Sequence, residues 1–482
     1  MKKALLCLLL VFSTTLLAAQ TIQSNQNLAV EKAESVSDEI KEASTRLWEY
    51  GEIALKEDRS AELLQKILEE HGFSVKRGVA GMPTAFIASY GSGKPVIGIL
   101  AEYDALPGVG NAPVPKREKR QDGITTGHGC GHNLFGAGSV YGAIAAKQVM
   151  EEQGISGTIK LYGTPAEETV VGKVYMAKEG VFDELDAVIH WHPSTKTQTE
   201  NESSLAMNNF EIEFFGQAAH GAADPWNGRS ALDAVELMNY GVNQMREHVM
   251  PSARMHYVIP NGGEAPNVVP EYAKVWYYVR DVSRDRVEEN YKRVLNIARG
   301  AATATETSHK VFLTTGVHET LLNRTLIEAL DENLRKVGPP EFTPSEQDYA
   351  KELQQNLGKE PKGFSSKIES LADSLLPPSG GSTDVAEVSF IAPTVGFSVA
   401  SAPLDVPWHS WATTSSHNTS GGKKSAVIAA KVISMTAVQM LMDNKLLVRA
   451  NEEFLKRTDG KAYKSPIPKD QQVPLPEKTD RE

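Results

Sequence analysis

An uninterrupted apolar run, Pro95–Ala101, constrains the fold of this 482-residue chain more than any other stretch. Seven residues without a polar side chain are typical of a strand in a sheet that helices cover on both faces. The acidic residues Glu102 and Asp104 follow directly. Open α/β sheets bind their ligands at the carboxyl ends of such strands, so an α/β fold with a site at this edge is expected. Asp104 could instead cap a turn.

The segment Gly127–Asn133, Gly-His-Gly-Cys-Gly-His-Asn, concentrates possible metal ligands. Cys130 and His132 are separated by one glycine, so a thiol and an imidazole can face one ion. The small, apolar run Leu134–Val149 predicts a buried helix, whose N-terminus would favour a thiolate. Taken alone, the segment could equally be a glycine loop with a chance histidine pair. His128 has no role that the sequence assigns.

Two further predicted strands end in chemically active residues. Gly157–Gly163 leads to Glu167 and Glu168, which could form a solvated corner. Adjacent side chains usually diverge, however, so one carboxylate can bind a metal while the other faces a substrate. The strand Ala187–Pro193 carries His190 and His192 on the same face, because side chains alternate along a strand. Either histidine is a candidate ligand.

A second domain is expected at residues 207–317. Its predicted order is strand, helix, strand, strand, helix, strand, which gives a small ferredoxin-like α+β sheet with helices on one face. The domain is expected to be an insertion, because acidic and histidine-bearing segments like those of the first domain resume after it. They are Ser382–Val385 and Trp408-His409. The first domain is therefore expected at residues 30–206 and 318–455. Residues 20–30 are expected to be loose, and the charged tail 456–482 to be mobile.

The N-terminal residues 1–19 are typical of a signal peptide, with a basic start, an apolar centre and Ala18-Ala19 before the cleavage point. An exported protein, periplasmic or secreted, is therefore expected. Cys130 would be its only cysteine and could not form an internal disulfide. It is either a buried core thiol or a metal ligand, and its glycine and histidine neighbours favour the ligand.

Composition bounds the partners of the chain. No other segment is predicted to cross a membrane. The formal net charge is −11 and is spread along the chain, which argues against nucleic acid as a partner.

The order of the motifs resembles the dimetal amidohydrolases of metallopeptidase family twenty. The Gly-His-Gly-Cys-Gly-His-Asn and Trp-His-Pro variants are most similar to the subgroup that utilises aminobenzoyl-glutamate. The likeness covers about residues 32–447. The motifs in chain order are Glu-Tyr-Asp-Ala-Leu-Pro, Gly-His-Gly-Cys-Gly-His-Asn, Pro-Ala-Glu-Glu, Trp-His-Pro, Gly-Gln-Ala-Ala-His, Gly-Ser-Thr-Asp-Val and His-Ser-Trp.

The resemblance implies a mixed-sheet catalytic domain with an inserted dimerisation domain, and two divalent metal ions per subunit. Zn or Mn is expected first, with Co or Ni as alternatives. The implied ligands are Cys130, His132, Glu168, His192 and His409. His190 competes with His192 for the strand-end position.

The resemblance also implies roles for residues that bind no metal. Glu167 matches the general base, and Asp104 matches a residue that orients a ligand histidine. His220 matches a histidine that reaches the neighbouring site in family homodimers. Asn267 and Arg280 resemble positions that hold the substrate's carboxylate.

The implied reaction is hydrolysis of the amide bond of N-acyl amino acids such as aminobenzoyl-glutamate. A dipeptidase or carboxypeptidase on the same scaffold is the first alternative. An inactive metal-dependent binding protein is disfavoured, because binding alone needs no base beside Glu168. A Ser-His-Asp hydrolase is disfavoured too, because the sequence has no Gly-x-Ser-x-Gly elbow.

Overall fold

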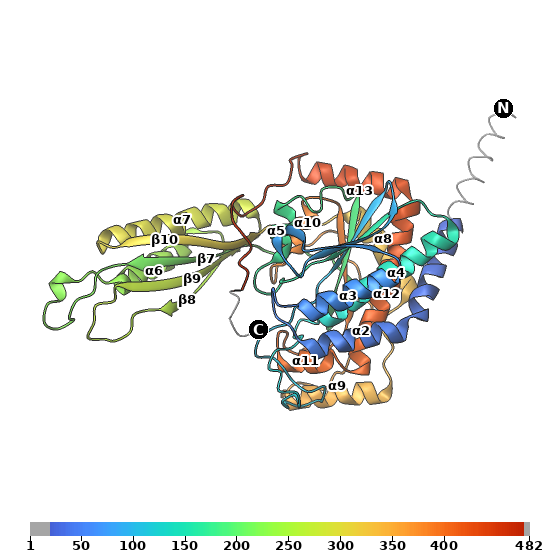
Figure 1. Ribbon diagram of the computed structural model, residues 1–482, viewed down its shortest axis with the longest axis horizontal. Coiled ribbons are helices and arrows are strands. Elements are labelled where there is room, and N and C mark those ends of the chain that lie inside the picture. Colours follow the sequence, from blue (N-terminus) through green and yellow to red (C-terminus); the bar gives the residue numbers. More distant parts are fainter. Residues whose placement is uncertain (1–19, 477–482) are drawn as a thin grey trace.

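The computed structural model describes residues 20–476 and has two lobes (Figure 1). The larger lobe, here the main domain, is built on a seven-stranded sheet. The smaller lobe, here the inserted domain, is built on a four-stranded sheet. The predicted signal peptide, residues 1–19, lies outside the described residues. This architecture is the predicted α/β domain with an α+β insertion.

The sheet of the main domain is parallel at its centre and antiparallel at its edges. Strands β4, β3, β5 and β11 run parallel to one another, while β2 and β6 join them antiparallel. Every residue of β3 is buried, as its apolar run predicts. In sheet order the strands are β1 (Ser74–Arg77), β2 (Phe86–Ser92), β4 (Gly157–Gly163), β3 (Val96–Ala101), β5 (Ala187–Ser194), β11 (Thr394–Ala400) and β6 (Gln198–Thr199).

Helices α4 and α12 pack against each other over this sheet and form much of the core. Glycines in α4 allow the close approach, since a Cβ at Gly142 would lie 2.8 Å from the side chain of Ile433. The helices of the domain are α2 (Ser37–Tyr50), α3 (Asp58–Glu70), α4 (His132–Gln153), α5 (Gly172–Lys178), α8 (Arg324–Val337), α9 (Pro344–Asn356), α10 (Val385–Ser389), α11 (Trp411–Ser416), α12 (Ser420–Met442) and α13 (Asn444–Arg457).

By length and composition α12 could cross a membrane, which corrects the expectation that no segment beyond the N-terminus is long and apolar enough. In the structure, 83% of its apolar window is buried. A central helix needs apolar residues on all sides, so composition alone cannot distinguish it from a membrane span.

The inserted domain has the predicted order of elements. Its sheet is antiparallel in the order β10-β7-β9-β8, and α6 and α7 cover one face. Along β9 buried residues alternate with Lys274, Trp276, Tyr278 and Arg280, which lie on the other face, here called the open face. The elements are β7 (Ala206–Phe215), α6 (Ala231–Met245), β8 (Arg254–Asn261), β9 (Tyr272–Asp281), α7 (Arg284–Ala304) and β10 (Ser308–Val317).

Both ends of the described chain are more ordered than predicted. Residues 20–35 are helical rather than loose. Residues 458–476 lack helix and strand but pack against the main domain, so the prediction of a mobile tail is wrong for this part. Ile467 is buried, the Tyr463 hydroxyl donates to Glu387, and Lys178 Nζ donates to the carbonyl of Gln471 at 2.6 Å. A few apolar anchors fix a segment whose average composition is polar.

Candidate metal centre and active site

The predicted site residues meet at the carboxyl ends of three parallel strands. Glu102 and Asp104 follow β3, Glu167 and Glu168 follow β4, and His192 lies near the end of β5. All of these except Asp104 line a cleft of about 510 Å³, a size typical of small-molecule sites. The open face of the inserted domain forms another wall, through Asn209, Tyr278, Arg280 and Thr315.

Cys130 belongs to two possible groups of metal ligands. The ligand atoms of Cys130, His132 and His192 lie within 4.8 Å of one another, and so do those of Cys130, Glu168 and His409. Glu102, His132 and Glu167 form a third such group. One thiol common to two groups is what a bridging ligand between two ions requires.

Local backbone geometry places Cys130 at the start of α4. Gly131 precedes the helix with φ of +85°, and a Cβ there would lie 2.8 Å from Cβ of Pro193, so only glycine fits. Cys130 Sγ lies 3.4 Å from His192 Nε2 and accepts the indole N–H of Trp408 at 3.4 Å. Burial, and secondarily Glu168, raises the pKa of this thiol, so a nearby cation is needed to favour the thiolate.

Asp104 connects the two possible ligand groups. Its Oδ1 lies 2.8 Å from His132 Nδ1, and its Oδ2 accepts the backbone N–H of Glu168 at 2.9 Å. Such a carboxylate fixes the tautomer of a ligand histidine and leaves Nε2 for the metal. The expected orienting position of Asp104 is therefore present in the geometry.

Two of the predicted metal ligands have a buried atom without a hydrogen-bond partner among the described residues: His132 Nε2 and Glu168 Oε1. His132 Nε2 lies 3.1 Å from a Glu102 oxygen, but this contact lacks hydrogen-bond geometry. Buried polar atoms are rarely left unpaired, and thiol, imidazole and carboxylate together suit a divalent transition metal. The residues present therefore fit a metal centre.

A strained turn presents the paired glutamates. Ala166, just before them, has φ of +64°, and its N–H donates to Glu57 at 2.9 Å. Burial, then Glu102 and Asp384, raises the pKa of Glu167 well above its ordinary value. Burial also raises the pKa of Glu168, to about 7. Glu57 is a buried carboxyl far away in the sequence, and no motif indicated it.

A buried lysine, also missed by the sequence analysis, balances the acids of the cleft. Lys173 Nζ lies 2.6 Å from Glu102 Oε1 and 2.6 Å from Asp384 Oδ1. Burial alone would lower the pKa of Lys173, but Asp384 and Glu102 outweigh it and raise the pKa. The only available indication was a lone lysine within the apolar segment 170–177.

The geometry favours His192 over His190 as the strand-end ligand. His192 belongs to a ligand group with Cys130, whereas His190 Nε2 lies 3.5 Å from Glu200 and belongs to none of the groups found among the described residues. His128 is fully buried with Nε2 3.0 Å from the carbonyl of Leu47, which gives it a structural position.

His409 reaches the cleft from the loop before α11. Its backbone has φ of +54°, an uncommon conformation outside glycine, and its side chain is 51% exposed. Its Nε2 lies 3.5 Å from Glu168. Strain at an exposed histidine is consistent with a residue held for a ligand.

The inserted domain delivers only one of its three predicted residues to the cleft of its own chain. Arg280 lines the cleft and donates to the Ser382 hydroxyl at 3.1 Å. His220 and Asn267 are exposed and lie in the β7–α6 and β8–β9 connections. These connections form the outer end of the domain (Figure 1). There the N–H of Gly221 donates to the carbonyl of Asn267 at 2.8 Å. A ten-residue strand, β9, separates Asn267 from Arg280, a span of about 30 Å.

Comparison with known proteins identifies relatives along most of the chain. The model of Peptidase family M20/M25/M40 matches residues 98–346. The chain is 38% identical over 449 residues to one subunit of the p-aminobenzoyl-glutamate hydrolase of Escherichia coli K12, over 88% of this chain and 93% of that protein. It is 28% identical over 457 residues to Xaa-Arg dipeptidase of Mus musculus, over 91% and 94%.

A solved structure shows the same fold. A dinuclear metal-binding peptidase of family M20 from Bacillus subtilis superposes with a TM-score of 0.56 at 18% identity, over 85% of this chain and 99% of that one. The predicted family and its likeness to the aminobenzoyl-glutamate subgroup are confirmed. The chain belongs to peptidase family M20/M25/M40 and is a metal-dependent amidohydrolase or peptidase.

Proposed function

We propose that this protein hydrolyses the amide bond of N-acyl amino acids, with aminobenzoyl-glutamate as the first candidate substrate. The observation that carries the proposal is Cys130 at the common corner of two ligand groups, with Glu167 beside them. The 38% identical relative, named as part of a p-aminobenzoyl-glutamate hydrolase, supports the choice of substrate.

Two divalent ions fit the two ligand groups. Cys130, His132 and His192 would hold one ion, and Cys130, Glu168 and His409 the other. When bound, such ions activate water and polarise the amide carbonyl. The ligand set suits Zn or Mn, and also Co or Ni.

Glu167 is the general base of the proposed reaction. It accepts a proton from the attacking water and then returns it to the nitrogen of the leaving amine as the C–N bond breaks. Its burial and the neighbouring carboxylates raise its pKa, which suits a group that must hold a proton between these steps. Asp104 holds His132 in one orientation throughout.

Arg280 is the candidate for binding the substrate's α-carboxylate. Its guanidinium lines the cleft, and its Nε is buried without a hydrogen-bond partner among the described residues. An arginine presents several fixed donors, so the remaining ones suit a carboxylate.

The proposed assembly is a homodimer in which the tip of one inserted domain completes the site of the other subunit. His220 and Asn267 adjoin each other at this tip, exposed and remote from their own cleft. Because the relative is named as one of the subunits of its hydrolase, a different hydrolase chain is the alternative partner. Light scattering of the purified protein distinguishes a dimer from a monomer.

Export is also proposed, on the signal-like N-terminus alone. Expression in a bacterial host followed by fractionation and N-terminal sequencing tests it. Mature protein beginning near Gln20 in the periplasm or medium supports export, and an intact Met1 in the cytoplasm contradicts it.

The substrate proposal is tested with a panel of N-acyl amino acids and dipeptides, assayed after loading with Zn, Mn, Co or Ni. Hydrolysis of N-acyl-glutamates is expected, and preferred cleavage of dipeptides would favour the dipeptidase alternative. Metal content by mass spectrometry should fall in Cys130→Ala and His192→Ala and stay unchanged in His190→Ala. Wild-type metal content in Cys130→Ala would make Cys130 a core thiol.

A further inference from the structure

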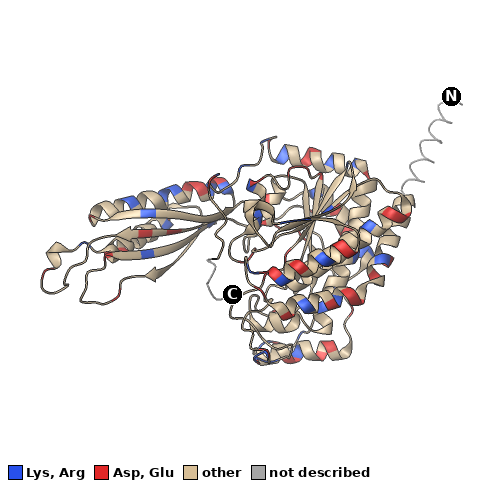
Figure 2. Ribbon diagram, in the orientation of Figure 1, with Lys and Arg blue, Asp and Glu red and all other residues tan. Residues whose placement is uncertain are grey.

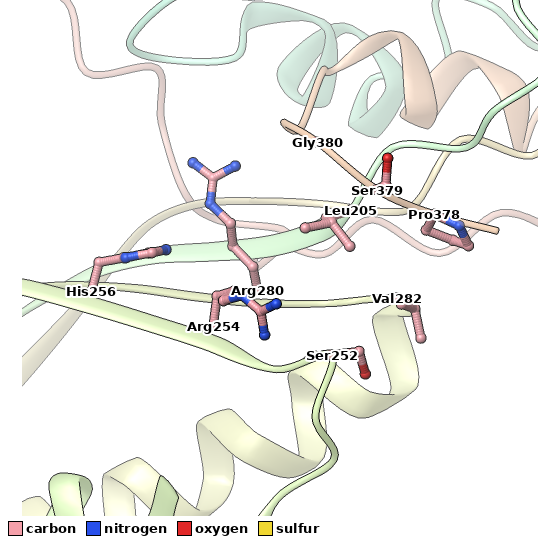
Figure 3. Close-up of a pocket in the computed structure, with 9 residues that line it drawn as sticks. All are labelled: Leu205, Ser252, Arg254, His256, Arg280, Val282, Pro378, Ser379 and Gly380. Atoms are coloured by element: carbon pink, nitrogen blue, oxygen red, sulfur yellow. The ribbon is translucent and has the colours of Figure 1, made fainter.

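A second hollow adjoins the catalytic cleft on the open face of the inserted domain. Its volume is about 400 Å³. Figure 3 shows Arg254, His256 and Arg280 on neighbouring strands around it, with Pro378–Gly380 along another side. Arg254 and His256 have no part in the site described so far.

The register of the strands concentrates positive charge here. Arg254 on β8 lies directly opposite Arg280 on β9, and His256 is two residues along the same face. Like charges directly opposite each other destabilise a strand pair unless something compensates them. Among the described residues, no carboxylate forms an ion pair with any of the three.

Two acids next to the hollow bond to hydroxyls of its lining, Ser252 and Ser379, and not to its basic residues. Asp281 follows Arg280 but lies on the covered face, where it accepts from Ser252 at 2.7 Å and from Asn290 at 3.1 Å. Glu202 accepts the hydroxyl of Ser379 and does not line the hollow. Arg254 Nη1 donates to the carbonyls of Pro251 and Ala253, which are neutral.

This charge is a local feature and does not follow from composition. The chain carries 61 acidic against 50 basic residues, a formal net charge of −11. In the view of Figure 2, acidic and basic residues alternate along the surface helices α2, α3 and α7. Burial, then Arg280, lowers the pKa of His256, so the fixed charge comes from the two arginines and His256 adds a hydrogen-bond donor. Two arginines without an ion-pair partner among the described residues mark a place suited to an anion.

The hollow and the cleft adjoin each other at Arg280, which lines both. The segment 379–383 also borders both, with Ser379 and Gly380 in the hollow and Gly381 to Thr383 in the cleft. A substrate whose α-carboxylate binds Arg280 can therefore extend its side chain toward Arg254 and His256.

We propose that Arg254 and His256, next to Arg280, form a subsite for the side-chain carboxylate of the substrate, so that the enzyme selects N-acylated acidic amino acids. This inference rests on the proposed function, because it concerns the substrate of the same site. It also separates this chain from a dipeptidase for C-terminal arginine, since a basic hollow repels a guanidinium.

The test compares N-acyl-glutamate with N-acyl-glutamine, which has nearly the same shape without the second charge. Wild type is expected to favour the glutamate compound in kcat/KM. In Arg254→Gln this ratio should fall by roughly 10- to 30-fold, the effect of one lost charge-assisted hydrogen bond, mainly through KM. Arg254→Lys should recover part of it. Arg299→Gln, an equal change of charge on the exposed side of α7, should leave the ratio unchanged.

Either of two outcomes overturns the subsite: no preference in wild type, or equal losses on both compounds in Arg254→Gln. Calorimetric binding to the Glu167→Gln protein keeps this result apart from the catalytic proposal. If wild type hydrolyses neither compound, but Glu167→Gln binds N-acyl-glutamate and the added Arg254→Gln weakens that binding at least tenfold, the subsite stands and the amidohydrolase proposal fails. Absence of binding in that case overturns both.

Discussion

The two domains hold their polar groups in opposite ways. In the main domain the polar groups are buried and paired within one chain: His132 with Asp104, and Lys173 with Glu102 and Asp384. In the inserted domain His220 and Asn267 are exposed, and Arg254 and His256 face a hollow with no acidic partner within residues 20–476. Folding alone fixes the first set, whereas the second set lacks partners that a substrate or another subunit can supply.

This difference predicts the largest effect at Glu167, the proposed general base in the main domain. Glu167→Gln should lower kcat by roughly two to four orders of magnitude, because the proton transfer is lost while size and metal binding remain. Metal content by mass spectrometry should equal that of wild type. Glu168→Gln is the matched variant and should lose metal. Near-normal turnover in Glu167→Gln would contradict the role of Glu167 as the general base.

The next effect concerns stability, and it separates buried from exposed ion pairs. Lys173→Met should reduce the free energy of unfolding by about 3–5 kcal/mol, because Glu102 and Asp384 keep buried charges without a partner. Lys94→Met removes an exposed pair with Asp186 and should cost about 0–1 kcal/mol. Urea denaturation measures both. Similar losses in the two variants would contradict the buried network.

The third prediction is that His220 of the inserted domain contributes to the active site of the partner subunit. His220→Ala is expected to lower kcat by roughly two to three orders of magnitude if it supplies a donor to the oxyanion. Mixing it with Glu167→Gln should restore activity, because each mixed dimer regains one intact site. The residual activity of each variant alone is the control. If activity does not recover although subunit exchange is proven, His220 does not act in the site of the partner subunit.

The last effect is a pH dependence of stability at Glu57, behind the glutamate turn. Burial, then Asp104, raises the pKa of Glu57 from 4.5 to about 8 in the folded protein. Below pH 4.5 both states hold the proton. Between 4.5 and about 8 only the folded state holds it, so this group makes stability fall as pH rises. The Tm of Glu57→Gln relative to wild type should therefore increase across this window, and a constant difference would contradict the shift.

The elements were predictable because they depend on short-range patterns, and the candidate ligands because their motifs stand in the order that the family resemblance implies. The apolar run of β3, the alternation along β5 and the glycine-rich start of α4 each identify an element together with the residues at its end. Parallel strands bring those ends to one edge, so Cys130, Glu168 and His192 were expected near one another.

Other parts of the site had no such pattern. Glu57 and Lys173 are ordinary charged residues in the sequence, and only packing places one against Ala166 and the other between two acids. Similarly, Ile467 and Tyr463 anchor a tail whose average composition is that of a mobile segment. Long-range burial decides these roles, and it leaves no local periodicity.

The sequence by itself determined the family, the order of the domains and the residues that can bind metal, because motif spacing and strand periodicity are local properties of the chain. Tertiary structure favours His192 over His190 as the candidate ligand, places Asn267 and His220 far from their own cleft, and brings Arg254 opposite Arg280. Distances between strands, the register of a sheet and the length of β9 set these outcomes, and none of the three can be read from neighbouring residues.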